Sequence, residues 1–219
     1  MNTHDASAGP GRFITLEGGE GVGKSTNLAF VAQLLESAGL DVLQTREPGG
    51  TPLAERVREI IVAPAGEPVP AMAELLLMFA ARSLHIENCI RPALAAGRWV
   101  LCDRFTDASY AYQGKARGLG EGTVRWLESQ VQGGLRPDLT LLLDADPAIG
   151  LARAGGRGAA DRFERERAEF FARVRAGYLE RAAAEPGRFR VIDASGPLEE
   201  VRGAITTHIN NFLQVHGKI

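Results

Sequence analysis

The residues with the clearest chemistry lie between positions 13 and 35, in the stretch FITLEGGEGVGKSTNLAFVAQLL. Gly18 and Gly23 are separated by four residues, and Lys24 and Ser25 follow at once, which is the spacing of a P-loop. In such a loop, backbone N–H groups surround phosphate oxygens, the lysine reaches the β- and γ-phosphates, and the hydroxyl binds Mg²⁺. The residues predicted to bind the phosphates of a nucleoside triphosphate are Gly18, Gly19, Glu20, Gly21, Val22, Gly23, Lys24, Ser25 and Thr26.

The context of this loop decides between a binding site and a chance match of a glycine-rich turn. An apolar run precedes the loop and a helical pattern follows it, as a P-loop requires. Apolar runs of this kind, the expected strands, occur at 13–17, 41–45, 98–103, 139–144 and 189–193. They are apolar almost throughout, which is typical of strands buried on both faces of a parallel sheet.

Helical patterns fill most of the sequence between the expected strands. We expect helices near 24–38, 52–62, 71–96, 121–133, 147–156, 161–184 and 197–215. Gly39 stands where the first helix should end, and Pro197 suits the first turn of the last one. The alternation of strand and helix predicts an α/β fold, in which a doubly wound five-stranded parallel sheet is flanked by helices.

The chain of 219 residues has the length of one sizeable domain, which we assign to residues 13–219. Residues 1–12 are expected to form a flexible N-terminal tail, and the Gly/Ala/Arg-rich break at 153–161 is interpreted as a mobile lid. The net charge of −2 gives no reason to expect nucleic acid or an anionic membrane as a partner, and no window of 18 apolar residues could span a membrane. Cys89 and Cys102 fit no metal or redox spacing, so a cytoplasmic protein is expected.

Three classes of P-loop protein compete at this point. A GTP-driven switch needs an Asn-Lys-x-Asp motif, and no Asn in the sequence is followed by Lys. A motor or transporter ATPase normally needs a longer chain and an inter-subunit signature. A small phosphotransferase needs an acceptor pocket, arginines that bind anions, and a lid that excludes water. The motifs that follow the second and third expected strands fit this third class.

The stretch TREPGGT, residues 45–51, opens a helix at the carboxyl end of a strand, where α/β sheets bind ligands. A binding role and a purely structural turn are equally consistent with it. After the third strand, Asp103 could approach a metal ion through water, and Arg104 could bind an acceptor phosphate. Ser109, Tyr112 and Gln113 offer hydroxyl and amide groups that could contact a base or sugar.

Phe79 and Arg82 lie three residues apart in a helical pattern and share one face. The aromatic ring could stack on a base and the cation could hold a phosphate. Core packing with an arginine that extends to solvent is equally consistent with this pair.

Taken together, these stretches resemble the bacterial thymidylate kinases, which phosphorylate dTMP to dTDP with ATP and Mg²⁺. The similarity runs from about Phe13 to the last expected helix, and the motifs that carry it are LEGGEGVGKST, TREPGGT, LLLMFAARS, CDRFTDASYAYQG and RPDLTLLLDADP. The resemblance implies the fold of the P-loop nucleoside monophosphate kinases with a mobile lid, a cytoplasmic enzyme of dTTP synthesis, and a homodimer. Its partners would be the small molecules dTMP and ATP.

The resemblance also implies roles for matching residues. Glu20 would lie near the 3′-OH of the acceptor and the metal, and Asp103 would join Ser25 in the Mg²⁺ shell. Arg104 would contact the dTMP phosphate and Arg82 the base side. The remaining substrate contacts would come from Glu47, Pro48, Leu53, Phe79, Ser109, Tyr112 and Gln113, with Tyr112 against the deoxyribose.

One position departs from the family pattern. The base-stacking Phe normally stands four residues before the arginine that matches Arg82, and here that position is Met78, with Phe79 next to it. Either a small rotation of the helix lets Phe79 stack on the base, or Met78 covers the base and Phe79 packs elsewhere.

The P-loop interior carries no basic residue, so the resemblance favours the subtype whose catalytic arginine lies in the lid. Arg153 and Arg157 are the candidates, acting with Lys24 and Arg104, and Glu164 would approach the metal or the acceptor sugar. A solvated charged helix face is the alternative interpretation of this region, and beyond residue 164 it is the preferred one.

Two other functions remain open on these residues. A deoxynucleoside or other nucleotide kinase would share the P-loop, and a deoxynucleoside kinase would need a base for a 5′-hydroxyl. A nucleoside monophosphate kinase needs no such base, because its acceptor is already an anionic phosphate oxygen. A non-catalytic nucleotide-binding module would bind ATP without any turnover that depends on an acceptor.

Overall fold

The computed structural model describes residues 11–64, 66–154, 162–163 and 166–216. Its strands are β1 (Phe13–Gly18), β2 (Val42–Arg46), β3 (Trp99–Asp103), β4 (Leu139–Asp144) and β5 (Phe189–Asp193). They form one parallel sheet in the order β2-β3-β1-β4-β5. The expectation of a five-stranded parallel α/β sheet is therefore confirmed.

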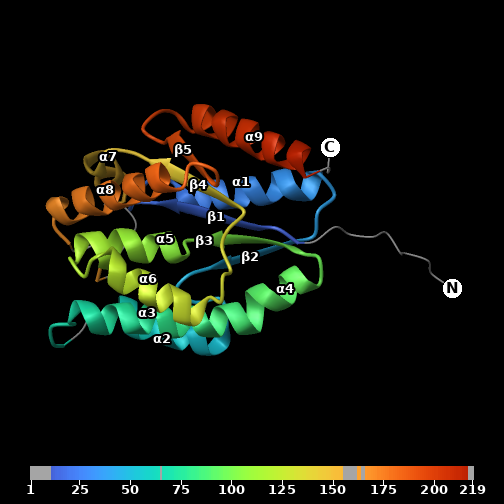
Figure 1. Cartoon of the computed structure of the whole chain (residues 1–219). Coiled ribbons are helices and arrows are strands. Elements are labelled where there is room, and N and C mark those ends of the chain that lie inside the picture. Colours follow the sequence, from blue (N-terminus) through green and yellow to red (C-terminus); the bar gives the residue numbers. More distant parts are fainter. Residues whose placement is uncertain (1–10, 65, 155–161, 164–165, 217–219) are drawn as a thin grey trace.

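Helices cover both faces of the sheet (Figure 1). On one face lie α1 (Lys24–Ser37) and α9 (Leu198–Val215), whose apolar side chains pack on Ile14 and Leu16 of β1 and on Leu139, Leu141 and Leu143 of β4. The other face carries the longer set of helices: α3 (Ala71–His85), η1 (Ile86–Ile90), α4 (Arg91–Ala95), α5 (Thr106–Ser109), η2 (Tyr110–Ala116) and α8 (Ala168–Ala184). The other helices are α2 (Pro52–Val62), α6 (Glu121–Val131) and α7 (Pro147–Ala154).

Most expected helices are present, with boundaries that differ in identifiable places. The expected helix 71–96 contains the π-helical stretch η1, and the expected helix 161–184 begins only at Ala168. Pro197 is the residue before the first turn of α9 rather than a member of it. Gly39 ends α1 as expected, because its φ of 79° lets the N–H of Leu40 reach the carbonyl of Leu35 at 3.2 Å.

The expected burial of every strand on both faces is wrong, and so is the expected end of the N-terminal tail at residue 12. β2 and β5 are the edge strands, so they are only partly buried, and Val191 in β5 is 47% exposed. Arg12, assigned to the tail, forms an ion pair with Asp138 at 2.9 Å and so belongs to the folded domain. The rest of the expected tail, 1–10, lies outside the described residues.

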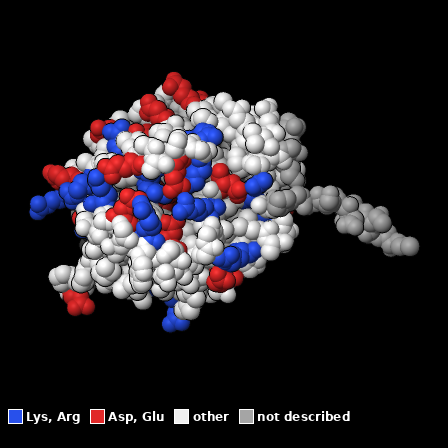
Figure 2. Space-filling view, viewed as in Figure 1, with Lys and Arg blue, Asp and Glu red and all other residues white. Residues whose placement is uncertain are grey.

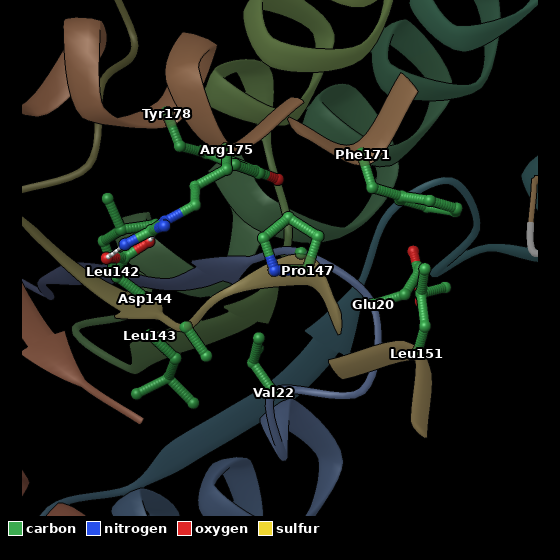
Figure 3. Close-up of a pocket in the computed structure, with 12 residues that line it drawn as sticks. Glu20, Val22, Leu142, Leu143, Asp144, Pro147, Leu151, Phe171, Arg175 and Tyr178 are labelled. Carbon is green, nitrogen blue, oxygen red and sulfur yellow. Dashed lines mark hydrogen bonds and ion pairs between the residues drawn. The ribbon is translucent and has the colours of Figure 1, made fainter. Parts of the chain in front are cut away.

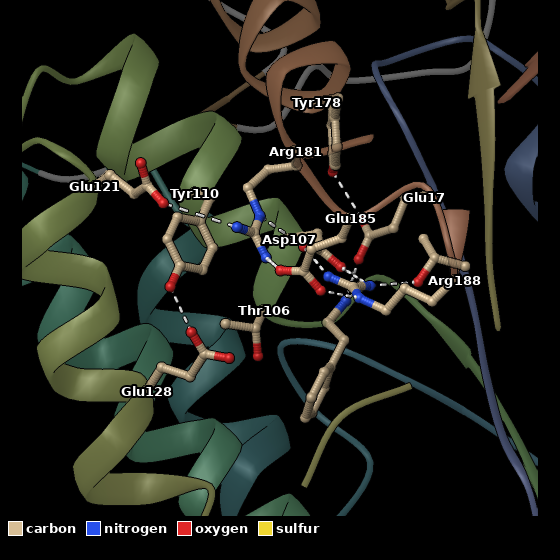
Figure 4. Close-up of polar contacts among 12 residues, drawn as sticks. Glu17, Thr106, Asp107, Tyr110, Glu121, Glu128, Tyr178, Arg181, Glu185 and Arg188 are labelled. Atoms are coloured by element: carbon tan, nitrogen blue, oxygen red, sulfur yellow. Dashed lines mark hydrogen bonds and ion pairs between the residues drawn. The ribbon is translucent and has the colours of Figure 1, made fainter. Parts of the chain in front are cut away.

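A helical segment between Thr106 and Ala116, formed by α5 and η2, is absent from the sequence expectations. It is attached to the domain by a buried carboxylate, Asp107, which accepts hydrogen bonds from Arg188 at 2.7 and 2.8 Å and from Arg181 at 3.1 Å (Figure 4). Arg188 also donates to Thr140 of β4 at 2.7 Å. This network fixes α5 and η2 against α8 and against the amino ends of β4 and β5.

Candidate functional site

The P-loop connects β1 to α1 and is shaped by close backbone contacts. Gly21 has a φ of 69°, and a Cβ there would lie 1.8 Å from the carbonyl oxygen of Gly150 in α7, so only glycine fits. The first turn of α1 has no side-chain cap, which leaves its N–H groups available for an anion. Lys24 is buried, and its Nζ donates to the carbonyl oxygens of Gly18, at 3.2 Å, and Gly19. Burial and the charge of Arg104 lower the pKa of Lys24 to about 8.

A small cavity of about 20 Å³ lies behind this loop, between the loop, α7 and α8 (Figure 3). It has room for about one water molecule. Gly19, Glu20 and Val22 line it on the loop side, and the bidentate ion pair of Arg175 with Asp144, at 2.8 Å, stands at its edge. This cavity borders the P-loop and is too small for a nucleotide.

A larger cavity of about 270 Å³ opens in front of the P-loop, between α2, α3, α5 and η2. It brings together most of the residues proposed from sequence. Those that line it are Glu20, Gly21, Gly23, Lys24, Ser25, Glu47, Pro48, Arg82, Asp103, Arg104, Ser109, Tyr112 and Gln113. Leu53 does not line it and is 49% exposed on α2.

Arg104 joins the P-loop to the chain that follows β3. Its Nη1 donates to the Gly18 carbonyl at 2.9 Å and to the Tyr178 hydroxyl at 3.0 Å, and its Nη2 donates to Glu20 at 2.7 Å. Tyr112 donates to the same carboxylate oxygen of Glu20 at 2.8 Å. Burial raises the pKa of Tyr112 well above its usual value, so this hydroxyl remains a proton donor.

Glu17 lies behind Arg104 and was not among the expected site residues. It is fully buried and accepts hydrogen bonds from the backbone N–H of Phe105 at 2.7 Å and from Tyr178 at 2.8 Å (Figure 4). Burial, together with the nearby charge of Asp107, raises the pKa of Glu17 to about 8. Glu17 therefore fixes both the turn after Arg104 and the hydroxyl to which Arg104 donates.

Arg82 is the second buried arginine of the cavity. Its Nε donates to Glu47 at 2.7 Å, and its Nη2 donates to Ser109 at 3.0 Å and to the Phe105 carbonyl at 3.2 Å. Its Nη1 is buried and has no hydrogen-bond partner among the described residues. Glu47 is held in turn by His85 at 3.0 Å, and the peptide bond between Glu47 and Pro48 is cis.

The two alternatives for the aromatic position are separated by the packing of α3. Met78 lines the cavity. Phe79 does not line it and packs in a buried cluster with Leu75, Tyr110 and Val124, with its ring 4.5 Å from the Arg82 guanidinium. The expectation that Phe79 contacts the substrate base therefore lacks support from the geometry, and Met78 takes its place at the cavity wall.

Arg58 is a cavity residue that the sequence analysis missed. It lies on α2, donates to the Pro48 carbonyl at 3.0 Å, and has its pKa lowered by burial and by the charge of Arg46. Arg58 and Val62 both line the cavity and stand four residues apart, which places them on one helix face. This four-residue spacing, in the helix that follows TREPGGT, is the sequence signal that could have identified Arg58 as a site residue.

Two of the three residues expected around Mg²⁺ lie in the cavity in front of the P-loop. Ser25 and Asp103 line the same cavity, and Oδ1 of Asp103 is buried without a hydrogen-bond partner among the described residues. The described chain contains no group of three His, Cys, Asp or Glu side chains that could enclose a metal. This set fits an ion that takes one or two protein ligands and completes its shell with phosphates and water, as Mg²⁺ does. Glu164 lies outside the described residues.

Of the two arginines expected in the lid, the structure describes only Arg153. Arg153, at the end of α7, donates to the carbonyls of Ala194 and Ser195, both at 2.8 Å, and so ties α7 to the loop after β5. It does not line the cavity in front of the P-loop. Arg157 and most of the expected lid lie outside the described residues.

Within the part of the chain that is described, no helix is both long and apolar enough to cross a membrane.

Comparison of the sequence with known proteins shows which family the chain resembles. The sequence model of the family described as thymidylate kinase matches residues 16–205. Thymidylate kinases from Methylococcus capsulatus and Teredinibacter turnerae are 58% and 57% identical to the chain, over 94% and 93% of its length and 99% of theirs. The thymidylate kinase from Chromohalobacter salexigens is 59% identical over 93% of this chain and 97% of its own.

The raised pKa of Glu17 predicts a pH-dependent stability. Its unfolded carboxyl ionises near pH 4.5, whereas the folded one keeps its proton until about pH 8. The stability that this proton contributes is therefore complete below pH 4.5 and is lost as the pH rises to about 8. Glu17→Gln removes the titration, so the stability of the wild type relative to this variant should fall by up to about 1.4 kcal/mol per pH unit across that range.

Urea denaturation of both proteins at about pH 5, 6.5 and 8 measures this difference. Glu87→Gln, at a carboxylate whose side chain is 60% exposed, is the matched control and should run parallel to the wild type. Parallel curves for Glu17→Gln as well would contradict the assignment.

Proposed function

The chain belongs to the thymidylate kinase family, and we propose that it transfers the γ-phosphoryl group of ATP to dTMP, giving dTDP and ADP, through the residues of the cavity in front of the P-loop. The observation that carries the assignment of the acceptor site is the concentration of buried or partly buried cations in this cavity. Lys24, Arg58, Arg82 and Arg104 all line it. A dianionic acceptor phosphate is the ligand that such a cavity stabilises best.

The phosphates of the two nucleotides would meet between Lys24 on one side and Arg58 and Arg104 on the other. Without a ligand these cations repel one another, and the lowered pKa of Lys24 and Arg58 includes that repulsion. Phosphate binding relieves it. An oxygen of the dTMP phosphate then forms a bond to the γ-phosphorus while the bond to the β,γ-bridging oxygen breaks, and ADP leaves. Catalysis is positioning and neutralisation of charge, and no base is required.

The polar groups of the cavity that do not hold phosphates indicate where the base and the deoxyribose of dTMP would lie. Nη1 of Arg82, which has no partner among the described residues, and the amide of Gln113 would meet the edge of the base, with Met78 at its face. Tyr112 and Glu20, joined at 2.8 Å, would adjoin the deoxyribose. Ser25 would ligate Mg²⁺ and Asp103 would hold one of its waters, and the ion would supply positive charge to the β- and γ-phosphates.

A deoxynucleoside kinase would use one of the cavity carboxylates as a base for a 5′-hydroxyl. Two of the three cavity carboxylates, Glu20 and Glu47, form ion pairs at 2.7 Å with Arg104 and Arg82 respectively, and the third, Asp103, is proposed for the Mg²⁺ shell. Both carboxylates already accept hydrogen bonds from a guanidinium, which favours the monophosphate acceptor.

The function is tested by measuring ADP formation from ATP and Mg²⁺ with dTMP, dUMP, AMP, CMP, GMP and thymidine offered separately. We expect the fastest turnover with dTMP, and none with a folded Lys24→Ala variant. Turnover with thymidine alone would identify a kinase that phosphorylates a hydroxyl. ATP binding without any acceptor-dependent turnover would leave only a nucleotide-binding module.

The lid is proposed to supply Arg157 to the transferring phosphoryl group. Because Arg153 is already held by two carbonyl oxygens, we expect Arg157→Ala to lower kcat at least about a hundredfold with little change in KM for dTMP, and Arg153→Ala to lower it much less. Steady-state kinetics of both variants provide the measurement. The reverse order of effects would move the catalytic role to Arg153.

Assembly as a homodimer is proposed through α2, α3 and α6. These helices carry exposed apolar side chains, namely Leu53, Ile60, Met72, Leu76 and Trp126. The surface over α3 and α6 is nearly free of charged groups, whereas positive and negative side chains alternate above it (Figure 2). Such a patch is typical of a surface that is covered by a partner.

Light scattering after size exclusion tests the dimer. The wild type should have the mass of two chains, and Leu76→Glu should shift it to one chain, because a carboxylate would be buried without a partner. Leu198→Glu changes a residue of similar exposure, 41% against 50%, on α9 and should stay dimeric. A monomeric wild type would exclude the proposal.

A further inference from the structure

Glu74 on α3 is a buried carboxylate to which neither the sequence analysis nor the proposed chemistry assigns a role. It is 1% exposed and lies directly behind the cavity wall formed by η2. One of its oxygens accepts a hydrogen bond from Nε2 of Gln113 at 2.7 Å. Nε of Arg117 also donates to this oxygen, at 3.4 Å. The other oxygen is paired with Arg162 at 2.7 Å and with Arg117 at 3.2 Å, and these two guanidinium groups compensate the buried charge.

This arrangement fixes which way the Gln113 amide points. A carboxylate paired with two arginines has only acceptor atoms, so the amide must present its NH₂ group to Glu74. Gln113 also lines the cavity, and its carbonyl oxygen is the amide atom left for a ligand. Among the residues that the structure describes, none donates a hydrogen bond to that oxygen.

A second group of the cavity is oriented in the same manner. Glu47 holds the Nε of Arg82, and Nη1 of Arg82 is buried without a partner in the described chain. Arg82 and Gln113 both line the cavity, so on the proposed placement of the base they would present it with one donor, from Arg82, and one acceptor, from Gln113. A 4-oxopyrimidine such as thymine matches this pair, because its N3–H donates and its O4 accepts. In a 4-aminopyrimidine such as cytosine both positions are reversed.

We propose that Glu74 is a positioning residue for base specificity: by holding the Gln113 amide in one orientation, it makes the cavity select 4-oxopyrimidine nucleotides over 4-aminopyrimidine nucleotides. This inference rests on the proposed placement of the dTMP base against Arg82 and Gln113. Loss of Glu74 frees the amide to rotate and present its NH₂ group to N3 of cytosine.

The test is the ratio of kcat/KM for dTMP to kcat/KM for dCMP in Glu74→Gln. A glutamine at position 74 can donate as well as accept, so both orientations of Gln113 become available. We expect the ratio to fall at least about tenfold, since a mispaired hydrogen-bonding group at a buried base edge discriminates by that much or more. The fall should come from a higher KM for dTMP and a lower KM for dCMP, with kcat for dTMP changed less.

Two parallel variants separate the possible causes. Arg117→Ala removes an ion pair of Glu74 and leaves its bond to Gln113, so it should lower thermal stability and leave the ratio unchanged. Gln113→Leu removes the amide altogether and should abolish the discrimination. An unchanged ratio in Gln113→Leu would overturn the placement of the base, whereas a collapse there with an unchanged ratio in Glu74→Gln would overturn only the role of Glu74.

If Glu74→Gln does not fold, Glu74→Asp replaces it. The shorter side chain keeps the charge for both arginines and withdraws the acceptor from Gln113, so the same fall in the ratio is expected. A ratio equal to that of the wild type, or equal falls in Glu74→Asp and Arg117→Ala, would exclude the proposal.

Discussion

The position of Arg104 is the constraint on which the rest of the site depends. Its φ of 66° is rarely adopted by residues with a side chain, and its backbone N–H donates to Leu16 of β1 at 3.0 Å. The guanidinium then bonds to the Gly18 carbonyl and to Glu20 in the P-loop. Because the chain turns in this unusual way, the segment after β3 and the loop after β1 meet at one side chain. The two nucleotide sites that we propose would thus be fixed relative to each other before either is filled.

Buried acidic side chains hold the other groups of the cavity. Glu17 fixes the turn after Arg104, Glu47 fixes Arg82, and Glu74 fixes Gln113. Each acid comes from a different element and restrains a group from another, so the orientation of the cavity groups follows from tertiary packing. Polar and charged groups that are oriented in advance need little rearrangement when a phosphate or base arrives, which is how an enclosed site gains most from electrostatics.

The sequence predicts the parts of this structure that depend on local pattern. The P-loop, the strands and most helices follow from glycine spacing and apolar runs, whereas the burial of edge strands depends on sheet order. The segment 106–116 escapes detection because its polar residues, Asp107 among them, are buried through partners distant in sequence. The choice between Met78 and Phe79 depends on the rotation of α3, which packing against Tyr110 and Val124 decides. Arg58 is missed because a single arginine on an amphipathic helix resembles a surface residue.

The contact between the P-loop and α7 bears on which arginine we propose for the catalytic role in the lid. The backbone of Gly150 approaches the loop so closely that a Cβ on it would lie 2.2 Å from the Glu20 carbonyl, and Arg153 is bonded to the loop after β5. The helix is therefore held at its start by the P-loop and at its end by residues 194–195. A side chain on α7 could reach the transferring phosphoryl group only by giving up these bonds. Because Arg153 is held in this way, we propose the catalytic role for Arg157 and an anchoring role for Arg153.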